Sequence, residues 1–174
     1  MENKRHILAY IAITLLCIYI SYNYLIIARV PTDSMEQTIL PGDFVVAIRG
    51  YYKHEIPRGG EIALFNKDDI FMCKRIIAVS GDEISFKNGD LYRNGEKVAE
   101  TYVKKGDNKT HYGEPLMNIR YKVPEGCCFL LGDNRDNSYD SRFWSNPYVS
   151  YDDLRAIVLF VVPIHIFNNS LHAQ

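Results

Sequence analysis

Residues 70–95 read IFMCKRIIAVSGDEISFKNGDLYRNG, and this stretch decides the fold that we expect. It contains three runs rich in β-branched and aromatic residues, which are typical of strands, and turn residues separate them. The runs cover residues 70–79, 83–86 and 91–93. Because the Asn-Gly pairs at 88–89 and 94–95 are strong hairpin signals, the stretch predicts antiparallel strands joined by tight turns.

Runs of the same composition recur on both sides of this stretch, again bounded by glycine or proline. The further expected strands are Phe44–Ile48, Glu61–Phe65, Ile119–Val123, Cys127–Leu131 and Ala156–Val162. Residues 101–118 are polar, and we expect an exposed connection there without a chemical role. The sequence therefore predicts an all-β domain built from antiparallel sheets.

Length and charge limit the classes of protein that fit. The 174 residues leave enough chain beyond a short anchor for one domain with a single core. With 20 Lys plus Arg against 21 Asp plus Glu, the formal net charge is -1. A protein that holds nucleic acid on a basic face carries a positive excess, so nucleic acid is not an expected partner.

An uncharged stretch at residues 7–28 precedes the predicted β domain. At ~1.5 Å per residue, a helix of this length spans ~33 Å, which matches the hydrocarbon core of a bilayer. A cleaved secretory signal is the alternative, but Ile26 and Ala28 do not form a small-x-small processing site and the stretch is too long. We therefore expect a short segment at 1–6, a transmembrane anchor at 7–28 and a β domain at 29–174.

The charges that flank the anchor predict its orientation. Lys4 and Arg5 precede the stretch, and only Arg29 follows it closely. By the positive-inside rule, the N-terminus lies in the cytoplasm and the β domain lies outside the plasma membrane. The lipid bilayer is thus an expected partner of a single-pass protein.

The four cysteines define neither a metal site nor a disulfide. Cys127 and Cys128 are neighbours whose side chains would leave a strand on opposite faces, and no Cys-x-x-Cys spacing occurs. Cys73 could form a disulfide with either of them or remain a free thiol, and the sequence does not choose. We expect no metal and no cofactor.

Ser34 lies in the sequence Pro31-Thr32-Asp33-Ser34-Met35, a few residues beyond the expected anchor. The stretch Ser34-Met35-Glu36-Gln37 also fits a capping box, in which the serine would cap a helix and have no chemical role. A nucleophilic serine needs a base, so a partner elsewhere in the chain decides between the two interpretations.

Lys74 lies inside the apolar run at 70–79, where strand alternation puts it on the same face as Met72 and Ile76. Desolvation there would lower the pKa of the lysine, and an amine that is neutral near pH 7 can act as a general base. The alternative is an edge-strand lysine whose ammonium group reaches solvent.

The segment GDNRDNSYDSR at 132–142 directly follows a predicted apolar strand. It is denser in charged, amide and hydroxyl groups than a surface turn requires. Its aspartates and arginines can pair with one another and with Arg75 to lock the loop, and a hydroxyl held beside Lys74 would orient the amine. A serine, a neutral lysine and a hydroxyl-rich loop are the parts of a Ser/Lys acyl-transfer site.

Together these segments resemble the successive motifs of bacterial type I signal peptidases. The matching stretches are residues 31–35, Gly42-Asp43, Gly60-Glu61-Ile62, Lys74-Arg75 with Gly81-Asp82, and residues 132–142. The resemblance covers roughly residues 5–162. It implies a membrane-anchored Ser/Lys endopeptidase of the compact, single-anchor form, which removes signal peptides from exported preproteins and has a largely antiparallel β fold.

The resemblance also implies a role for each matching residue. Ser34 resembles the nucleophile and Lys74 the general base. Thr32 resembles the residue whose hydroxyl joins the Ser34 amide in the oxyanion hole, and Ser138 resembles the hydroxyl that orients the lysine. The implied supporting residues are Arg75, Asp140 and Arg142, and the implied substrate-pocket residues are Val30, Met35, Met72 and Cys73.

Two positions depart from the family pattern. Gln37 stands where the family usually has proline, and Ser145 stands where glycine is common. We therefore expect the turn after Ser34 and the rim of the pocket to differ from those of the family, while every reacting group is retained.

Other classes of protein fit less well. A Ser/His/Asp hydrolase needs a histidine beside its nucleophile, and a penicillin-binding enzyme needs Ser-x-x-Lys, which does not occur. The histidines, all outside the three motif segments, are His6, His54, His111, His165 and His172. A self-cleaving repressor-type protease would carry a DNA-binding domain in place of the anchor. The remaining alternatives are a non-catalytic, membrane-tethered β domain that binds exported proteins and a peptidase dedicated to a pilus or conjugation system.

Overall fold

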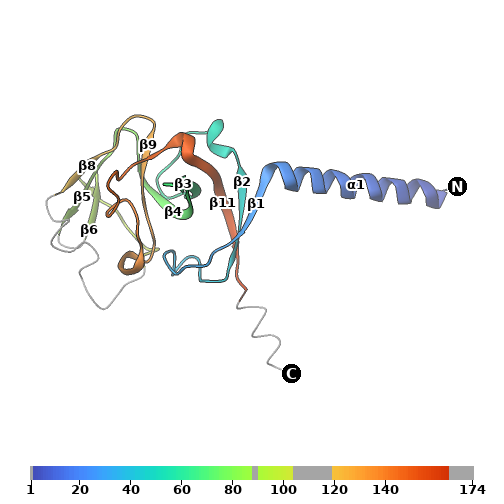
Figure 1. The fold of residues 1–174 in the computed structure, drawn as a ribbon, viewed down its shortest axis with the longest axis horizontal. Helices are drawn as coiled ribbons and strands as arrows, with labels where there is room; N and C mark the ends of the chain where they lie inside the picture. The colour runs from blue at the N-terminus through green and yellow to red at the C-terminus, as the bar shows by residue number, and fades with distance from the viewer. Residues whose placement is uncertain (1, 88–89, 104–118, 165–174) are drawn as a thin grey trace, which may run out of the picture.

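The computed structural model describes residues 2–87, 90–103 and 119–164. In these ranges one α-helix leads into an all-β domain, as Figure 1 shows. The helix α1 is Glu2–Tyr24, and the strands are β1 Leu25–Arg29, β2 Phe44–Arg49, β3 Ile62–Lys67, β4 Ile70–Val79, β5 Glu83–Lys87, β6 Asp90–Arg93, β7 Glu96–Lys97, β8 Arg120–Lys122, β9 Cys127–Leu131, β10 Val149–Ser150 and β11 Leu154–Val162. Three short 3₁₀ helices are η1 Tyr51–Lys53, η3 Arg135–Asn137 and η4 Tyr151–Asp153.

Helix α1 projects away from the β domain (Figure 1). Its stretch Lys4–Tyr24 is long and apolar enough to cross a membrane, and none of its most apolar window is buried inside the protein. Apolar side chains on all sides of a helix favour a lipid environment over water. The helix is therefore consistent with the expected membrane anchor.

The end of the helix differs from the sequence-based expectation. Residues 25–28, which we assigned to the anchor, form most of strand β1 instead. This strand pairs with β2 in an antiparallel register in which Leu25 faces Ile48 and Arg29 faces Phe44. Because an apolar run of Leu, Ile and Ala suits a membrane helix and a buried strand equally, hydropathy did not separate the two.

The strands form two antiparallel sheets. The larger sheet has seven strands in the order β1-β2-β11-β3-β4-β9-β10, and the smaller has four in the order β7-β6-β5-β8. The long strand β4 lies between β3 and β9, with Ala63 facing Lys74 and Leu131 facing Arg75. Ser34 precedes β2 in the chain, whereas Lys74 is held in the interior of the larger sheet.

The predicted all-β fold is confirmed, with all eight expected strands present. Strands β4 and β9 have the predicted bounds, and the others differ at their ends by one or two residues. The hairpin at Asn94-Gly95 joins β6 to β7, and both turn residues have positive φ, 54° and 83°, as a type I′ turn requires. Residues 88–89 and 104–118, which include most of the expected polar connection, lie outside the described residues.

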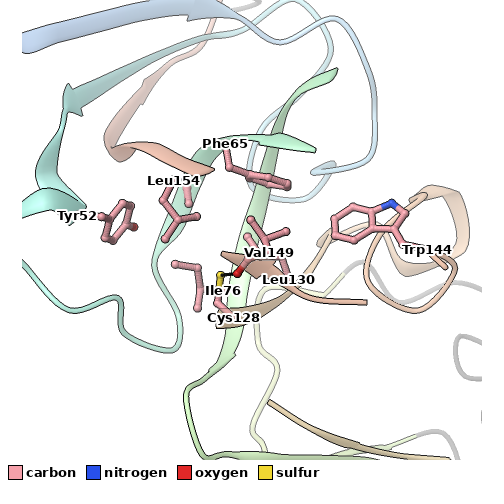
Figure 2. Close-up of a cluster of buried hydrophobic side chains, with 9 residues drawn as sticks. Tyr52, Phe65, Ile76, Cys128, Leu130, Trp144, Val149 and Leu154 are labelled. Atoms are coloured by element: carbon pink, nitrogen blue, oxygen red, sulfur yellow. Dashed lines mark hydrogen bonds between the residues drawn. The ribbon is translucent and has the colours of Figure 1, made fainter. Parts of the chain in front are cut away.

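The apolar core is divided into three clusters. One lies between the two sheets and contains Ile84, Phe86 and Phe129. A second gathers side chains from β3, β4 and β9, with Trp144 at its margin, as Figure 2 shows. The third packs Met35 and Ile39 against Val45 and Leu64, so the segment that carries Ser34 is anchored directly in the core.

The cysteines are all free thiols, so the disulfide that we left open for Cys73 is not formed. Cys73 packs against the cluster that contains Met35, whereas Cys128 belongs to the Trp144 cluster. Cys128 donates a hydrogen bond to the Val149 carbonyl over 3.4 Å (Figure 2). Burial raises the pKa of the Cys73 thiol to about 12 and also raises that of Cys128, which keeps both as neutral thiols.

Candidate active site

Ser34 lies on a tight turn between β1 and β2. The Val30 amide donates to the Asp43 carbonyl over 2.8 Å, and the Ile39 amide donates to the Met35 carbonyl over 2.8 Å. Met35 is fully buried, so the residue after Ser34 fixes the turn to the core. No α-helix begins at Ser34 within this described segment, and the capping-box interpretation is therefore wrong.

The turn after Ser34 contains an unusual backbone conformation at Gln37, whose φ is 99°. Proline has its φ locked near −65°, so it cannot occupy this position without a different turn. The expectation that the turn departs from the family pattern at Gln37 is therefore consistent with the local backbone.

The side chains of Ser34 and Lys74 meet although they are distant in the sequence. Lys74 Nζ lies 2.6 Å from Ser34 Oγ, which is a short hydrogen-bonding distance. Ser34 is 8% exposed and Lys74 is 6% exposed, so the pair is shielded from bulk water. The alternative in which Lys74 reaches solvent from an edge strand is wrong, because β4 is flanked by β3 and β9.

Burial sets the charge of the lysine. Desolvation lowers the pKa of Lys74 below its ordinary value of 10.5. The Asp140 carboxylate acts in the opposite direction, and the Arg142 guanidinium lowers the pKa again. Desolvation is the largest of these effects, so the pKa of Lys74 is lowered overall.

Thr32 lies next to the Ser34 hydroxyl, with Thr32 Oγ1 and Ser34 Oγ 3.3 Å apart. The Thr32 side chain is otherwise exposed at the mouth of the site. Among the described residues, no acceptor is paired with the Ser34 amide. A hydroxyl and a backbone amide that converge beside a nucleophile are suitable donors for an oxyanion.

The loop at 132–142 is locked by a buried ion pair. Arg142 donates to Asp140 through Nε over 2.8 Å and through Nη2 over 2.9 Å, and both side chains have no exposed surface. Asp140 also accepts from the Gly132 amide over 3.0 Å, and Arg142 donates to the Arg135 carbonyl over 2.9 Å. Two ends of the loop are thus joined through one bidentate pair, which fixes its shape.

A second buried pair connects this loop to β4 and to the Ser34 turn. Arg75 donates to Asp133 through Nε over 2.8 Å and through Nη2 over 2.6 Å. Asp133 also accepts from the Thr38 hydroxyl over 2.5 Å. Arg75 therefore pairs with Asp133, while the neighbouring Lys74 contacts Ser34.

Residues 100 and 102 contact two arginines beside the site. The Arg75 guanidinium stacks on the Tyr102 ring at 4.1 Å, and Arg135 donates to Glu100 over 2.6 Å. Tyr102 belongs to the expected polar connection at 101–118, and its contact with Arg75 is a packing contact, so the absence of chemistry in that connection stays a prediction. Neither contact could be predicted from the sequence, because an isolated tyrosine or glutamate does not identify a partner more than 20 residues away in the chain.

The loop at 132–142 also holds the backbone of Ser34. The Asn134 amide donates to the Ser34 carbonyl over 3.1 Å, and the Asn134 side chain donates to the Asp33 carbonyl over 3.1 Å. Gly132 lies so close that a Cβ there would collide with the Ser34 carbonyl oxygen and with Ser138 Oγ. The site requires a residue without a side chain at this point.

Ser138 is buried beside Gly132 and is 6% exposed. Its hydroxyl makes no hydrogen bond with any described residue, so the expected contact with Lys74 is not formed in this structure. A buried hydroxyl without a partner costs free energy and is uncommon in folded proteins. Ser138 nevertheless lies near Ser34, because both residues border the Cβ position of Gly132.

An apolar cleft of about 360 Å³ opens in front of Ser34 and Lys74. Of the expected pocket residues, Val30, Met72 and Cys73 line it, but Met35 does not. Met35 is instead a core residue, because its side chain points into the cluster beneath the turn. Further lining residues that the sequence did not reveal are Ile70, Phe71, Asn137 and Tyr139.

No group of three or more His, Cys, Asp or Glu side chains placed to hold a metal ion occurs in the described ranges. The residues at the site are a hydroxyl, an amine and hydrogen-bond donors. Their arrangement suits acyl transfer from a substrate carbonyl.

Comparison with known proteins identifies the family. The profile of the family described as "Signal peptidase, peptidase S26" matches residues 3–162, and the chain therefore belongs to this family. Signal peptidase I S of Bacillus subtilis is 39% identical over 117 residues, which is 63% of this chain and 62% of that protein. The probable signal peptidase I-2 of Synechocystis is 36% identical over 123 residues, which is 66% of this chain and 53% of that protein.

The chain thus spans less than two thirds of the length of these curated relatives. Among solved structures, a signal peptidase I from Enterococcus faecalis is similar, with 26% sequence identity and a TM-score of 0.48. The alignment covers 60% of this chain and 97% of that one.

Proposed function

We propose that this protein is a membrane-bound serine endopeptidase that removes N-terminal signal peptides from preproteins through a Ser34/Lys74 dyad. The observation that carries the proposal is the 2.6 Å separation of Lys74 Nζ and Ser34 Oγ in a buried site. Membership of the signal peptidase family supports the reaction and the class of substrate. Removal of a signal peptide is hydrolysis of one peptide bond, which is the chemistry that such a dyad performs.

In the proposed mechanism, neutral Lys74 takes the proton of the Ser34 hydroxyl while Ser34 Oγ attacks the scissile carbonyl carbon. The amine then gives its proton to the nitrogen of the leaving mature protein, and the signal peptide remains as an ester of Ser34. Lys74 next takes a proton from a water molecule, whose oxygen attacks the ester carbonyl carbon. The bond between that carbon and Ser34 Oγ then breaks, Lys74 returns its proton to Ser34 Oγ, and the signal peptide leaves with a new carboxyl terminus. A lowered pKa for Lys74 supports this scheme, because only the neutral amine can accept a proton.

The surrounding residues are assigned supporting roles. Ser138 is proposed to orient Lys74. Its buried hydroxyl has no partner among the described residues, so it can accept a hydrogen bond from the ammonium group that forms when Lys74 takes the Ser34 proton. The pair Asp140–Arg142 keeps the loop in place, and Arg75 does so through Asp133. Val30, Met72 and Cys73 are proposed to contact the substrate from the cleft.

The Thr32 hydroxyl and the Ser34 amide are proposed to stabilise the oxyanion of the tetrahedral intermediate. Replacing Thr32 with valine is expected to lower kcat by roughly 10²–10³-fold, because one donor of an oxyanion hole contributes about that much. The Thr32→Ser variant keeps the donor and should retain most of the activity. Since Thr32 is exposed, both variants should melt like wild type, and equal kcat values in the two variants would contradict the assignment.

The position of the site fits a substrate held in a membrane. The chain from Tyr24 to Ser34 can reach at most ~36 Å even when fully extended. Ser34 thus stays within that distance of the end of the proposed anchor, on the side of the membrane where the cleavage site of a signal peptide in the bilayer would emerge. We propose a single-pass topology, with the N-terminus in the cytoplasm and the β domain outside the plasma membrane.

The direct experiment is processing of a purified preprotein by the full chain in detergent, with mass spectrometry of the mature N-terminus. Cleavage at one site is expected, with small side chains at the -1 and -3 positions, because an extended substrate sends alternate residues into the cleft. A protein that binds the preprotein without cleaving it would instead be the non-catalytic, tethered β domain. Comparing exported and pilus or conjugation substrates in the same assay separates a general from a dedicated role.

A further inference from the structure

A second cavity, of about 510 Å³, shares the lining residue Phe71 with the Ser34 cleft. Three cationic side chains line it, those of Arg49, Lys53 and Arg155, whereas Asp152 supplies one carboxylate. Ile26 and other apolar side chains complete its wall. A cavity with this excess of positive charge favours an anionic ligand.

The three cations are available to such a ligand. Within residues 2–87, 90–103 and 119–164, none of them forms an ion pair with a carboxylate. Arg155 is nevertheless held in place, because the Asn66 amide, turned so that its oxygen faces Arg155, accepts from its Nη2 and Nε over 3.2 Å each. An arginine fixed by a neutral partner keeps its full charge and its remaining donors for a bidentate contact with phosphate.

The cavity lies at the end of the domain that adjoins the proposed anchor. Helix α1 ends at Tyr24, and Leu25, the next residue, faces Ile48 across the β1–β2 pair. Arg49 follows Ile48 directly and faces Ala156 on β11, next to Arg155. Since paired strands are about 4.8 Å apart, these arginines lie close to the level at which the chain would leave the membrane.

We propose that this cavity binds the phosphate group of an anionic phospholipid headgroup. The headgroup layer lies at the end of a membrane-spanning helix, so the phosphates of the leaflet are at the level of Arg49 and Arg155. A phosphodiester that carries a net negative charge matches the cationic lining, and a zwitterionic headgroup does so less well. The inference rests on the proposed membrane anchoring of α1 and is independent of the Ser34/Lys74 chemistry.

The test uses the full chain in dodecyl maltoside micelles and measures its melting temperature without any substrate. Phosphatidylglycerol, phosphatidylcholine at the same mole fraction, and inorganic phosphate without lipid are added in separate arms. Saturating phosphatidylglycerol is expected to raise Tm by ~5 °C or more, because a ligand that binds only the folded state stabilises it. Phosphatidylcholine should cause less than half of that shift.

Matched variants assign the effect to the cavity. The double variant Arg49→Gln/Arg155→Gln should lose the shift, and Arg49→Lys/Arg155→Lys should keep part of it. The double variant Arg58→Gln/Lys87→Gln removes the same charge from exposed positions outside the cavity and should behave like wild type. A Ser34→Ala variant should also keep the shift, so a failure of the proposed peptidase activity would leave this result unchanged.

Three outcomes would overturn the proposal. Equal shifts with phosphatidylcholine and phosphatidylglycerol would show that net negative charge is not recognised. A shift with inorganic phosphate but none with phosphatidylglycerol would assign the cavity to a soluble anion. An undiminished shift in Arg49→Gln/Arg155→Gln, with the variant folded as judged by its own melting transition, would place the lipid elsewhere.

Discussion

The Ser34→Ala and Lys74→Met variants are each expected to lose about 10⁵–10⁶-fold in kcat for preprotein processing, and the double variant should lose no more than either alone. The two side chains act as one unit, since Ser34 becomes a nucleophile only when the adjacent Lys74 Nζ takes the proton of its hydroxyl. Removing either group therefore removes the whole nucleophilic step. Single-turnover assays with excess enzyme measure these losses directly.

Stability separates this loss from simple unfolding. A buried, desolvated amine costs folding free energy, so Lys74→Met should melt at or above the wild-type temperature at pH 7. Lys87→Met, at an exposed strand position outside the cleft, serves as the matched control and should keep full activity. Near-normal turnover by folded Lys74→Met would refute the dyad.

The Gly132→Ala variant is expected to lose ~10²-fold or more in kcat, although residue 132 carries no reacting group. The new methyl group would collide with the Ser34 carbonyl oxygen and Ser138 Oγ, and it would lie 2.6 Å from Ser138 Cβ. Since Asn134 also holds the Ser34 carbonyl, the Ser34 backbone must shift, and the nucleophile shifts with it. Overpacking of this kind should also cost about 1–3 kcal/mol of unfolding free energy.

The control for Gly132→Ala is Gly126→Ala. Gly126 has a φ of 69° and open space where a Cβ would lie, so alanine there strains the backbone by about 1 kcal/mol without touching the site. The control should therefore lose some stability and keep its kcat. Similar kcat values for the two variants, both assayed below their melting temperatures, would show that residue 132 does not position Ser34.

The sequence predicted the β domain well where strands are long and apolar. Strands β4 and β9 were predicted to the residue, because continuous runs of β-branched side chains end at clear turn residues. Strand β1 was assigned to the anchor, because burial of Ile26 and Ala28 against the Val45 cluster depends on pairing with β2. The very short strands β7 and β10 were missed, because two residues carry no periodicity.

At the site, the sequence motifs predicted the reacting groups, but they did not predict several of the residues that pack around those groups. Ser34 and Lys74 were proposed from the surroundings of each residue, and their side chains do meet. The packing of Tyr102 on Arg75 and the pairing of Glu100 with Arg135 depend on how the chain returns to the site. Met35 was expected in the cleft, but the turn directs its side chain into the core cluster that contains Val45. The sequence motif does not reveal this direction.

The most direct test of the account is the titration of Lys74 itself. Lysine labelled at Cε in the full chain, assigned by comparison with Lys74→Met, reports by NMR the pH at which the amine loses its charge. Because burial lowers the pKa, we predict a midpoint below the ordinary 10.5. The neutral fraction grows as pH rises through that midpoint, so kcat/KM should rise over the same interval and level off before pH 10.5. A Lys74 that stays an ammonium ion up to about pH 10.5, while the enzyme is already fully active at lower pH, would contradict the proposed mechanism.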